Sequence, residues 1–295
     1  MLSPARRHAG FTLVELVMVI ALSGIVLVMI GVALSRPMEG YLAQNRRTEL
    51  VDLAAGALVR LSRDVRLAVP NSLRVSADGR ALELMLTHEA GRYRPNRTGS
   101  TTLRFSGAAG CSDGLPADDC NAFFLLEPEA DLNGEGWLVV NNVGAESNGV
   151  PVAGQNLWAY ADGGVVTPDG VRFSAVGDPA TGETRVSLSG LPTTGFAFNQ
   201  PSPAWRVYFA REVVGYRCEG GRLWRYVTRT RSPSLPVALP AGAVPLVASV
   251  SECAGLFGYQ SGSIQRAAIL RVRLALGEAG ESLRLLQQVH VDNAP

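Results

Sequence analysis

The chain has 295 residues, 18% of them charged, and a formal net charge of +1, which excludes recognition of nucleic acid or acidic substrates by bulk positive charge. The four cysteines, at positions 111, 120, 218 and 253, contain no Cys-x-x-Cys pair and stand beside only three histidines. This favours disulfides in an oxidising compartment over a zinc site or a redox motif. The length alone predicts roughly two domains, but one apolar stretch accounts for much of the amino-terminal share and leaves a single sizeable folded body.

Residues 1–10, MLSPARRHAG, form a short leader with two arginines, Arg6 and Arg7. Positive charge before an apolar segment holds that end in the cytoplasm. The predicted orientation therefore has the amino terminus inside and the rest of the chain exported.

Residues 11–34, FTLVELVMVIALSGIVLVMIGVAL, contain one charge, Glu15, and as a helix would span roughly 36 Å, enough to cross a bilayer. The alternative is an ordinary secretory signal peptide cut near residues 33–35. Against it, the apolar run exceeds the usual ~7–15 residues and contains a carboxylate. That carboxylate costs several kcal/mol in hydrocarbon unless it is neutralised or paired. A protonated Glu15 that reaches the head groups is the alternative to a pairing role.

Residues 10–15, GFTLVE, followed by an apolar run, resemble the signature of type IV prepilins and type II secretion pseudopilins. The resemblance implies that a prepilin peptidase cuts between Gly10 and Phe11 and methylates the new amine of Phe11. Glu15 then becomes the fifth residue of the mature chain. The resemblance further implies that Glu15 pairs with the terminal amine of a neighbouring subunit and sets the axial register of a filament.

Residues 35–69 predict an amphipathic stem helix, with a kink or brief break at Pro37 and an end near Val69. Its polar side mixes arginines with acids such as Asp52 and Asp64, so we expect a solvated or subunit-facing surface rather than a lipid- or nucleic-acid-binding one. Its apolar stripe comprises Leu42, Leu50, Leu53, Ala54, Ala57, Leu58, Leu61 and Val65.

Residues 70–295 predict a β-rich head of short strands separated by glycine- and proline-rich turns. A hairpin is expected around Asp78-Gly79, and the last two strands should flank residues 277–280. Further strands are expected at residues 102–105, 137–141, 171–175, 185–188, 206–214, 223–228, 269–276 and 282–291. The fold class is α+β, a long helix packed on an antiparallel sheet, which is also the arrangement that the resemblance implies.

The cysteines can pair in three ways. Cys111 and Cys120 bracket a short loop, which favours a local bridge, and we expect Cys218 to pair with Cys253. Each closure would stabilise the head by roughly 3 kcal/mol in the chain-entropy model.

Residues 213–218, VVGYRC, and 221–226, GRLWRY, look like the larger minor pilins of the class that includes PilW and the secretion pseudopilin J. Residues 36–41, RPMEGY, and 287–295, QQVHVDNAP, are similar to MshO-type minor pilins of the mannose-sensitive haemagglutinin (MSHA) pilus. Residues 91–203 match no such motif.

This resemblance implies a non-enzymatic minor subunit that acts in a priming or tip complex. Its partners would be other minor and major pilins, the inner-membrane assembly platform and the lipid bilayer, with no nucleic acid. It would be a single-pass inner-membrane protein with a periplasmic head and no cofactor. A J-type pseudopilin of type II secretion is the alternative, and a pilus-tip adhesin or a membrane-anchored periplasmic enzyme would be alternatives of other classes.

Motifs for chemistry are weak. Asp131, Asn133 and Glu135 have the spacing of a calcium loop, but Asn142 stands where the bidentate glutamate belongs, so a polar turn is the better interpretation. The head's tryptophans could form a ligand-binding surface, although core packing is the favoured interpretation; they are Trp137, Trp158, Trp205 and Trp224.

Overall fold

The computed structural model describes residues 10–96, 99–106, 121–127, 132–159, 164–262, 267–278, 280–291 and 293, with the backbone alone at residues 34–40, 42 and 43. It divides into an amino-terminal unit that ends at Val51 and a head unit that begins at Asp52.

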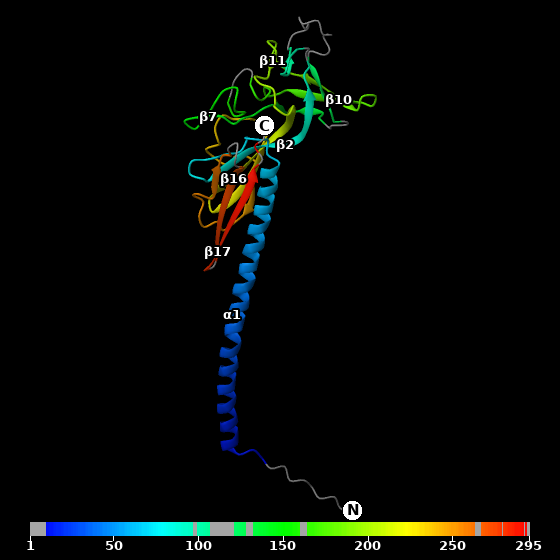
Figure 1. The fold of residues 1–295 in the computed structure, drawn as a ribbon. Helices are drawn as coiled ribbons and strands as arrows, with labels where there is room; N and C mark the ends of the chain where they lie inside the picture. Colours follow the sequence, from blue (N-terminus) through cyan, green and yellow to red (C-terminus); the bar gives the residue numbers. More distant parts are fainter. Residues whose placement is uncertain are drawn as a thin grey trace, which may run out of the picture. The chain divides into compact units, whose positions relative to one another are not determined.

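Helix α1 runs from Leu13 to Arg66 and is the blue coil of Figure 1. Of the kink or brief break expected at Pro37, the break is wrong, because the helix continues through that residue. Proline removes a single backbone donor, and the hydrogen bonds of the turns on either side keep the segment helical.

The expected end near Val69 is also wrong by three residues, because strand pairing takes over from the helix. The amide of Leu67 donates to the backbone carbonyls of both Arg63 and Asp64, which tightens the last turn. Beyond it, Thr87 donates to the carbonyl of Leu67 at 2.8 Å, and Val69 donates to that of Met85 at 2.8 Å.

The head contains a ten-stranded sheet whose neighbouring strands are antiparallel, in the order β14-β13-β12-β2-β4-β10-β9-β5, with β1 beside β2 and β6 beside β12. Strand β12 is central, and its pairing with β2 shifts register around Ala210. The strands are β1 (Arg74–Val75), β2 (Ala81–Arg94), β4 (Ala122–Leu125), β5 (Gly134–Glu135), β6 (Trp137–Val139), β9 (Arg172–Asp178), β10 (Glu183–Ser189), β12 (Arg206–Glu219), β13 (Arg222–Thr228) and β14 (Val244–Val247).

Three smaller sheets complete the described part of the head: β15-β16-β17, β11-β3 and β7-β8. Figure 1 shows the long hairpin β16–β17 beside the end of α1 that belongs to the head unit, and the side chain of Gln287 donates to Ser62 Oγ there at 2.8 Å. Their strands are β3 (Arg104–Phe105), β7 (Glu146–Ser147), β8 (Val150–Pro151), β11 (Phe196–Ala197), β15 (Phe257–Gln260), β16 (Ala268–Glu278) and β17 (Glu281–Val291).

The head is therefore strand-rich and follows an amino-terminal apolar helix, which is the α+β class that the sequence predicts. Every expected strand is present, and the Asp78-Gly79 turn joins β1 to β2 with Gly79 at φ 67°. On β16, Leu270, Val272 and Leu274 are buried while the arginines between them are exposed, as the alternation predicts.

Two clusters of buried side chains lie outside the helix in the described part of the head. One packs phenylalanines from β3, β4, β9, β11 and β12 with edge and stacked ring contacts. The other surrounds Trp137 and Trp158. The predicted stripe of α1 is buried at Ala54, Leu61 and Val65, but Leu53 is 44% exposed because it lies off the line that these three residues follow.

Candidate functional site

The amino end of α1 is built as a capped helix start. The helix begins at Leu13, and the amide of Glu15 donates to Thr12 Oγ1 at 3.3 Å and to the Thr12 carbonyl at 3.1 Å. A threonine followed three residues later by a glutamate is the spacing of a capping box. The negative side chain of Glu15 also lies in the first turn, where the helix dipole favours an anion.

Gly10 precedes this cap and is exposed. A Cβ added to it would meet nothing within 4 Å, and its φ is not in the left-handed region. Neither the backbone at position 10 nor the packing of the described residues therefore requires glycine there. Phe11, on the other side of the expected cut, is 79% exposed.

The apolar segment Leu13–Ala33 has a mean hydropathy of 2.9, and none of it is buried. Its 21 residues span about 30 Å as a helix, the thickness of the hydrocarbon core of a bilayer. Glu15 is the single charged residue in it. A secretory signal helix would satisfy the same test of length and composition. The residues around the expected cut, and not the helix itself, therefore distinguish the two kinds of segment.

Within the head unit, Asp64 of α1 is buried and ties the helix to the large sheet. It accepts a hydrogen bond from Tyr216 Oη on β12 at 2.6 Å and one from Arg225 Nε on β13 at 2.8 Å. The expectation that Asp64 belongs to a solvated or subunit-facing surface is wrong, because two donors from the sheet compensate its burial. Burial and the bond to Asp64 raise the pKa of Tyr216. Burial alone would lower the pKa of Arg225, and Asp64 overcomes that effect and raises it.

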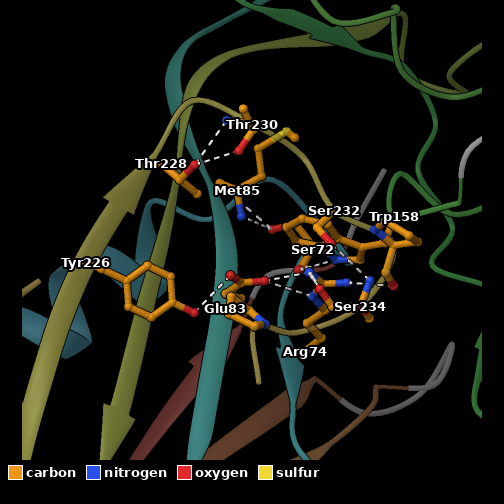
Figure 2. A network of polar contacts seen from close by, with 12 residues as sticks. Ser72, Arg74, Glu83, Met85, Trp158, Tyr226, Thr228, Thr230, Ser232 and Ser234 are labelled. Atoms are coloured by element: carbon orange, nitrogen blue, oxygen red, sulfur yellow. Dashed lines mark hydrogen bonds and ion pairs between the residues drawn. The ribbon is translucent and has the colours of Figure 1, made fainter. Parts of the chain in front are cut away.

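A second buried carboxylate, Glu83 of β2, holds a polar network that Figure 2 shows. It accepts hydrogen bonds from Tyr226 Oη at 2.9 Å and from Arg74 Nε at 3.1 Å. Burial and the charge of Glu83 raise the pKa of Tyr226. The Arg74 guanidinium also stacks on the ring of Trp158, 3.8 Å from its centroid, and Trp158 Nε1 donates to the Ser72 carbonyl at 2.8 Å.

Gly215 of β12 makes this network possible. It pairs with Glu83 across the sheet, and a Cβ at position 215 would lie 1.9 Å from Tyr226 Cζ. The ring of Tyr226 therefore occupies the space that any other residue at position 215 would need.

Two arginines of this region also hold the proline-rich segment 232–240, here called the strap. Arg74 donates to the carbonyls of Pro233 at 3.1 Å and Ser234 at 3.2 Å. Arg217 donates to those of Pro236 at 2.9 Å and Val237 at 2.6 Å. The side chain of Val237 is 91% exposed, so the strap is held by its main chain while it presents side chains outward.

Cys218 and Cys253 form a disulfide with a Cα–Cα distance of 5.4 Å, the pairing that the sequence led us to expect. Cys111 and Cys120 lie outside the described residues, and their pairing stays a prediction.

Asp131 of the weak calcium motif also lies outside the described residues. Asn133 Oδ1 accepts a hydrogen bond from the Ala175 amide, and Glu135 pairs with Arg172. In the described part of the chain no three His, Cys, Asp or Glu side chains are grouped to hold a metal.

The four tryptophans take different places. Trp137 and Trp158 are core residues at 3% and 2% exposure, and Trp205 packs against the phenylalanine-rich cluster. Trp224 is half-buried, with the Arg222 guanidinium over its ring. Core packing is thus confirmed for the first three.

The buried carboxylates and the strap were missed by sequence reasoning. A charge at helical spacing looks the same whether it faces water or a sheet, and the prolines of the strap were visible only as a break between strands.

Comparison with known proteins gives one finding. Residues 5–31 match the family model described as the prokaryotic N-terminal methylation motif. Neither the curated proteins nor the solved structures contain a match to this chain. The matched segment holds the capped helix start and most of the apolar span described above.

Proposed function

We propose that this chain, which its methylation motif identifies as type IV pilin- or pseudopilin-like, is a minor subunit that helps to build a type IV pilus of the MSHA kind. The motif implies processing by a prepilin peptidase and assembly with other pilins. With its apolar helix it fits a single-pass membrane-anchored protein. In the proposed topology the amino terminus is cytoplasmic and the head periplasmic.

The observation that carries the proposal is an unburied apolar helix that begins with one carboxylate. No side chain of Leu13–Ala33 is buried among the described residues, and an apolar helix of this length left exposed needs lipid or other helices around it. Glu15 is exposed on that helix, and a charge placed so in hydrocarbon is functional by default.

The proposed cut explains both Gly10 and Glu15. Since the fold does not require glycine at position 10, the requirement is assigned to the peptidase that cuts there. Cleavage would free a positive amine on Phe11 at the positive end of the helix dipole, where a cation is disfavoured by up to about 1 kcal/mol. Glu15 of one subunit and the amine of the next would then neutralise each other as a subunit enters the filament.

The proposed role in a priming or tip complex, acting through contacts rather than catalysis, rests on the sequence resemblance and on the size of the head. A head of 244 residues, Asp52–Pro295, has steric room at a tip because no subunit lies above it. A J-type pseudopilin of type II secretion has the same physics with different partners, and the neighbouring genes separate the two.

Mass spectrometry of the membrane-extracted chain tests the proposal. The mature chain should begin with N-methylated Phe11, and Gly10→Val should leave the leader attached without disturbing the fold, since position 10 has open space around it. Any other mature terminus contradicts the proposed processing.

Filament incorporation tests the role of Glu15. Glu15→Gln should still be cut and methylated but should fail to enter filaments, because the neutral amide cannot pair with the neighbouring amine. Glu49→Gln, an exposed acid further along α1, is the matched control and should be incorporated normally. Normal incorporation of the Glu15 variant would contradict the pairing.

A further inference from the structure

Three arginines project from one face of the sheet β15-β16-β17. Arg271 and Arg273 of β16 and Arg284 of β17 are all exposed, and we call their outward side chains the arginine face. Within the described residues none of the three side chains has an ion pair or a hydrogen bond. No described acid of this chain therefore neutralises them, and an anion from outside the chain could do so.

The spacing of Arg271 and Arg273 places two like charges side by side. Residues two apart on a strand point to the same face at a separation of about 7 Å, and two like charges at that distance repel each other. No acid stands directly across the strands from either residue in the described part of the sheet: Arg271 pairs with Gln288 and Arg273 with Leu286. An anionic ligand would relieve this repulsion.

A hollow lies next to these two arginines. Its volume is about 460 Å³, and glycines and the aromatic residues of β15 line it together with Arg271 and Arg273. Gly258 is paired directly with Arg271, so a side chain at position 258 would point to the arginine face. The missing side chain leaves the backbone of β15 bare beside the two guanidinium groups.

Gly258 has no structural reason to be glycine. A Cβ built on it meets nothing within 4 Å, and its φ is outside the left-handed region. Glycine inside a strand weakens the strand, and one use of it is to let a ligand or another backbone approach closely. The fold thus leaves the hollow open although a glycine at position 258 weakens strand β15.

We infer that the arginine face, with the hollow at Gly258, binds an extended acidic segment of another protein. Alternate side chains of an extended segment are about 7 Å apart, which matches the spacing of Arg271 and Arg273, and the main chain would lie over the bare strand. Leu286 is 64% exposed directly across from Arg273 and offers the segment an apolar contact beside that charge. That the segment belongs to a fellow subunit rests on the proposed function.

Binding of a synthetic peptide to the full chain in zwitterionic detergent tests the inference. The probe is a short peptide in which glutamate alternates with serine and valine, and its glutamine counterpart is the control. We expect saturable binding of the glutamate peptide, weaker at high salt, and no binding of its counterpart. Two exposed ion pairs together are worth roughly a tenfold change in affinity, so the double variant Arg271→Gln/Arg273→Gln should weaken binding about tenfold.

Two further variants separate the site from general charge. Gly258→Val should fold normally, since β-branched residues favour strands and the position has room, yet it should also lose the peptide. Arg206→Gln removes an exposed arginine from β12 and should leave the affinity unchanged. Equal binding by the double variant and the wild type would overturn the inference.

Inorganic phosphate and phosphatidylglycerol vesicles serve as competing probes. If either binds the arginine face as tightly as the peptide does, the assignment to a polypeptide is wrong. The readout is independent of processing: a chain without methylated Phe11 that binds the peptide refutes the proposed function alone, and a methylated chain that does not bind it refutes this inference alone.

Discussion

Asp64 should be the residue on which attachment of the helix to the sheet depends most. Replacing it with asparagine keeps the shape but removes the charge, and the new amide group faces the Nε–H of Arg225, which is also a donor. The side chains of Asp64 and Arg225 are 11% and 14% exposed, so Arg225 would be left almost buried without its anion. Breaking a fully buried pair costs about 3–5 kcal/mol.

Water reaches part of this pair, so the expected loss lies below that range, at about 2–3 kcal/mol of unfolding free energy, which is also the worth of a hydrogen bond to a charged group. Tyr216→Phe removes the hydroxyl that donates to the same carboxylate but leaves Arg225 paired, so it should cost about 1.5 kcal/mol, the low end for a hydrogen bond to a charged group. The double variant Asp64→Asn/Arg225→Gln should cost less than the sum of the two single changes, because the residues share one interaction.

Guanidinium unfolding of the full chain in detergent, followed by tryptophan fluorescence, measures these differences, since all four tryptophans lie in the head. Asp52→Asn, an exposed acid of the same helix, is the matched control and should shift the midpoint little. A variant at Asp64 that unfolds at the same guanidinium concentration as the Asp52 control would refute the idea that this carboxylate fastens the helix.

Three other outcomes can be measured in the same way. Gly215→Ala should destabilise the head by about 3 kcal/mol or more, because the ring of Tyr226 stands in the way, and adding Tyr226→Ala should recover part of that loss; full stability of the single variant contradicts this. The raised pKa values of Tyr216 and Tyr226 give stability that is fully present below pH 10, their ordinary pKa, and is lost above it, by about 1.4 kcal/mol per pH unit for each residue. Unfolding measured at rising pH should therefore show that the free energy of unfolding decreases with pH. The decrease should be less steep in the Tyr226→Phe variant. Replacing Cys218 and Cys253 with serine opens a closure of 35 residues and should cost about 4 kcal/mol of unfolding free energy in the chain-entropy model. An unchanged midpoint would contradict the idea that the bridge stabilises the head by restricting the unfolded chain.

Local patterns predicted much of the fold. The alternation on β16 and the glycine turns of two hairpins follow from rules that act within a few residues. The amino end was predictable for a different reason: glycine, cap and carboxylate stand close together within residues 10–15, and the match at residues 5–31 covers that segment.

The remainder depends on contacts that sequence spacing does not encode. Asp64 and Tyr216 are 152 residues apart, so nothing local distinguishes this carboxylate from Asp52, which is exposed. Short strands such as β5 and β7 have only two residues each, too few for any periodicity. Pro37 shows the opposite case, in which a strong local rule yields to the helix around it.

The strap shows how a protein can fix a loop without fixing its sequence. Arg74 and Arg217 donate hydrogen bonds to backbone carbonyl oxygens of the strap, and every amino acid has such an oxygen. Replacing Val237 with a polar or aromatic residue therefore leaves the attachment intact. Drift in this stretch can therefore change which molecules the surface meets while the fold beneath is unaffected. Such a segment is a natural place for related chains to diverge in binding preference, and a practical site for grafting a tag.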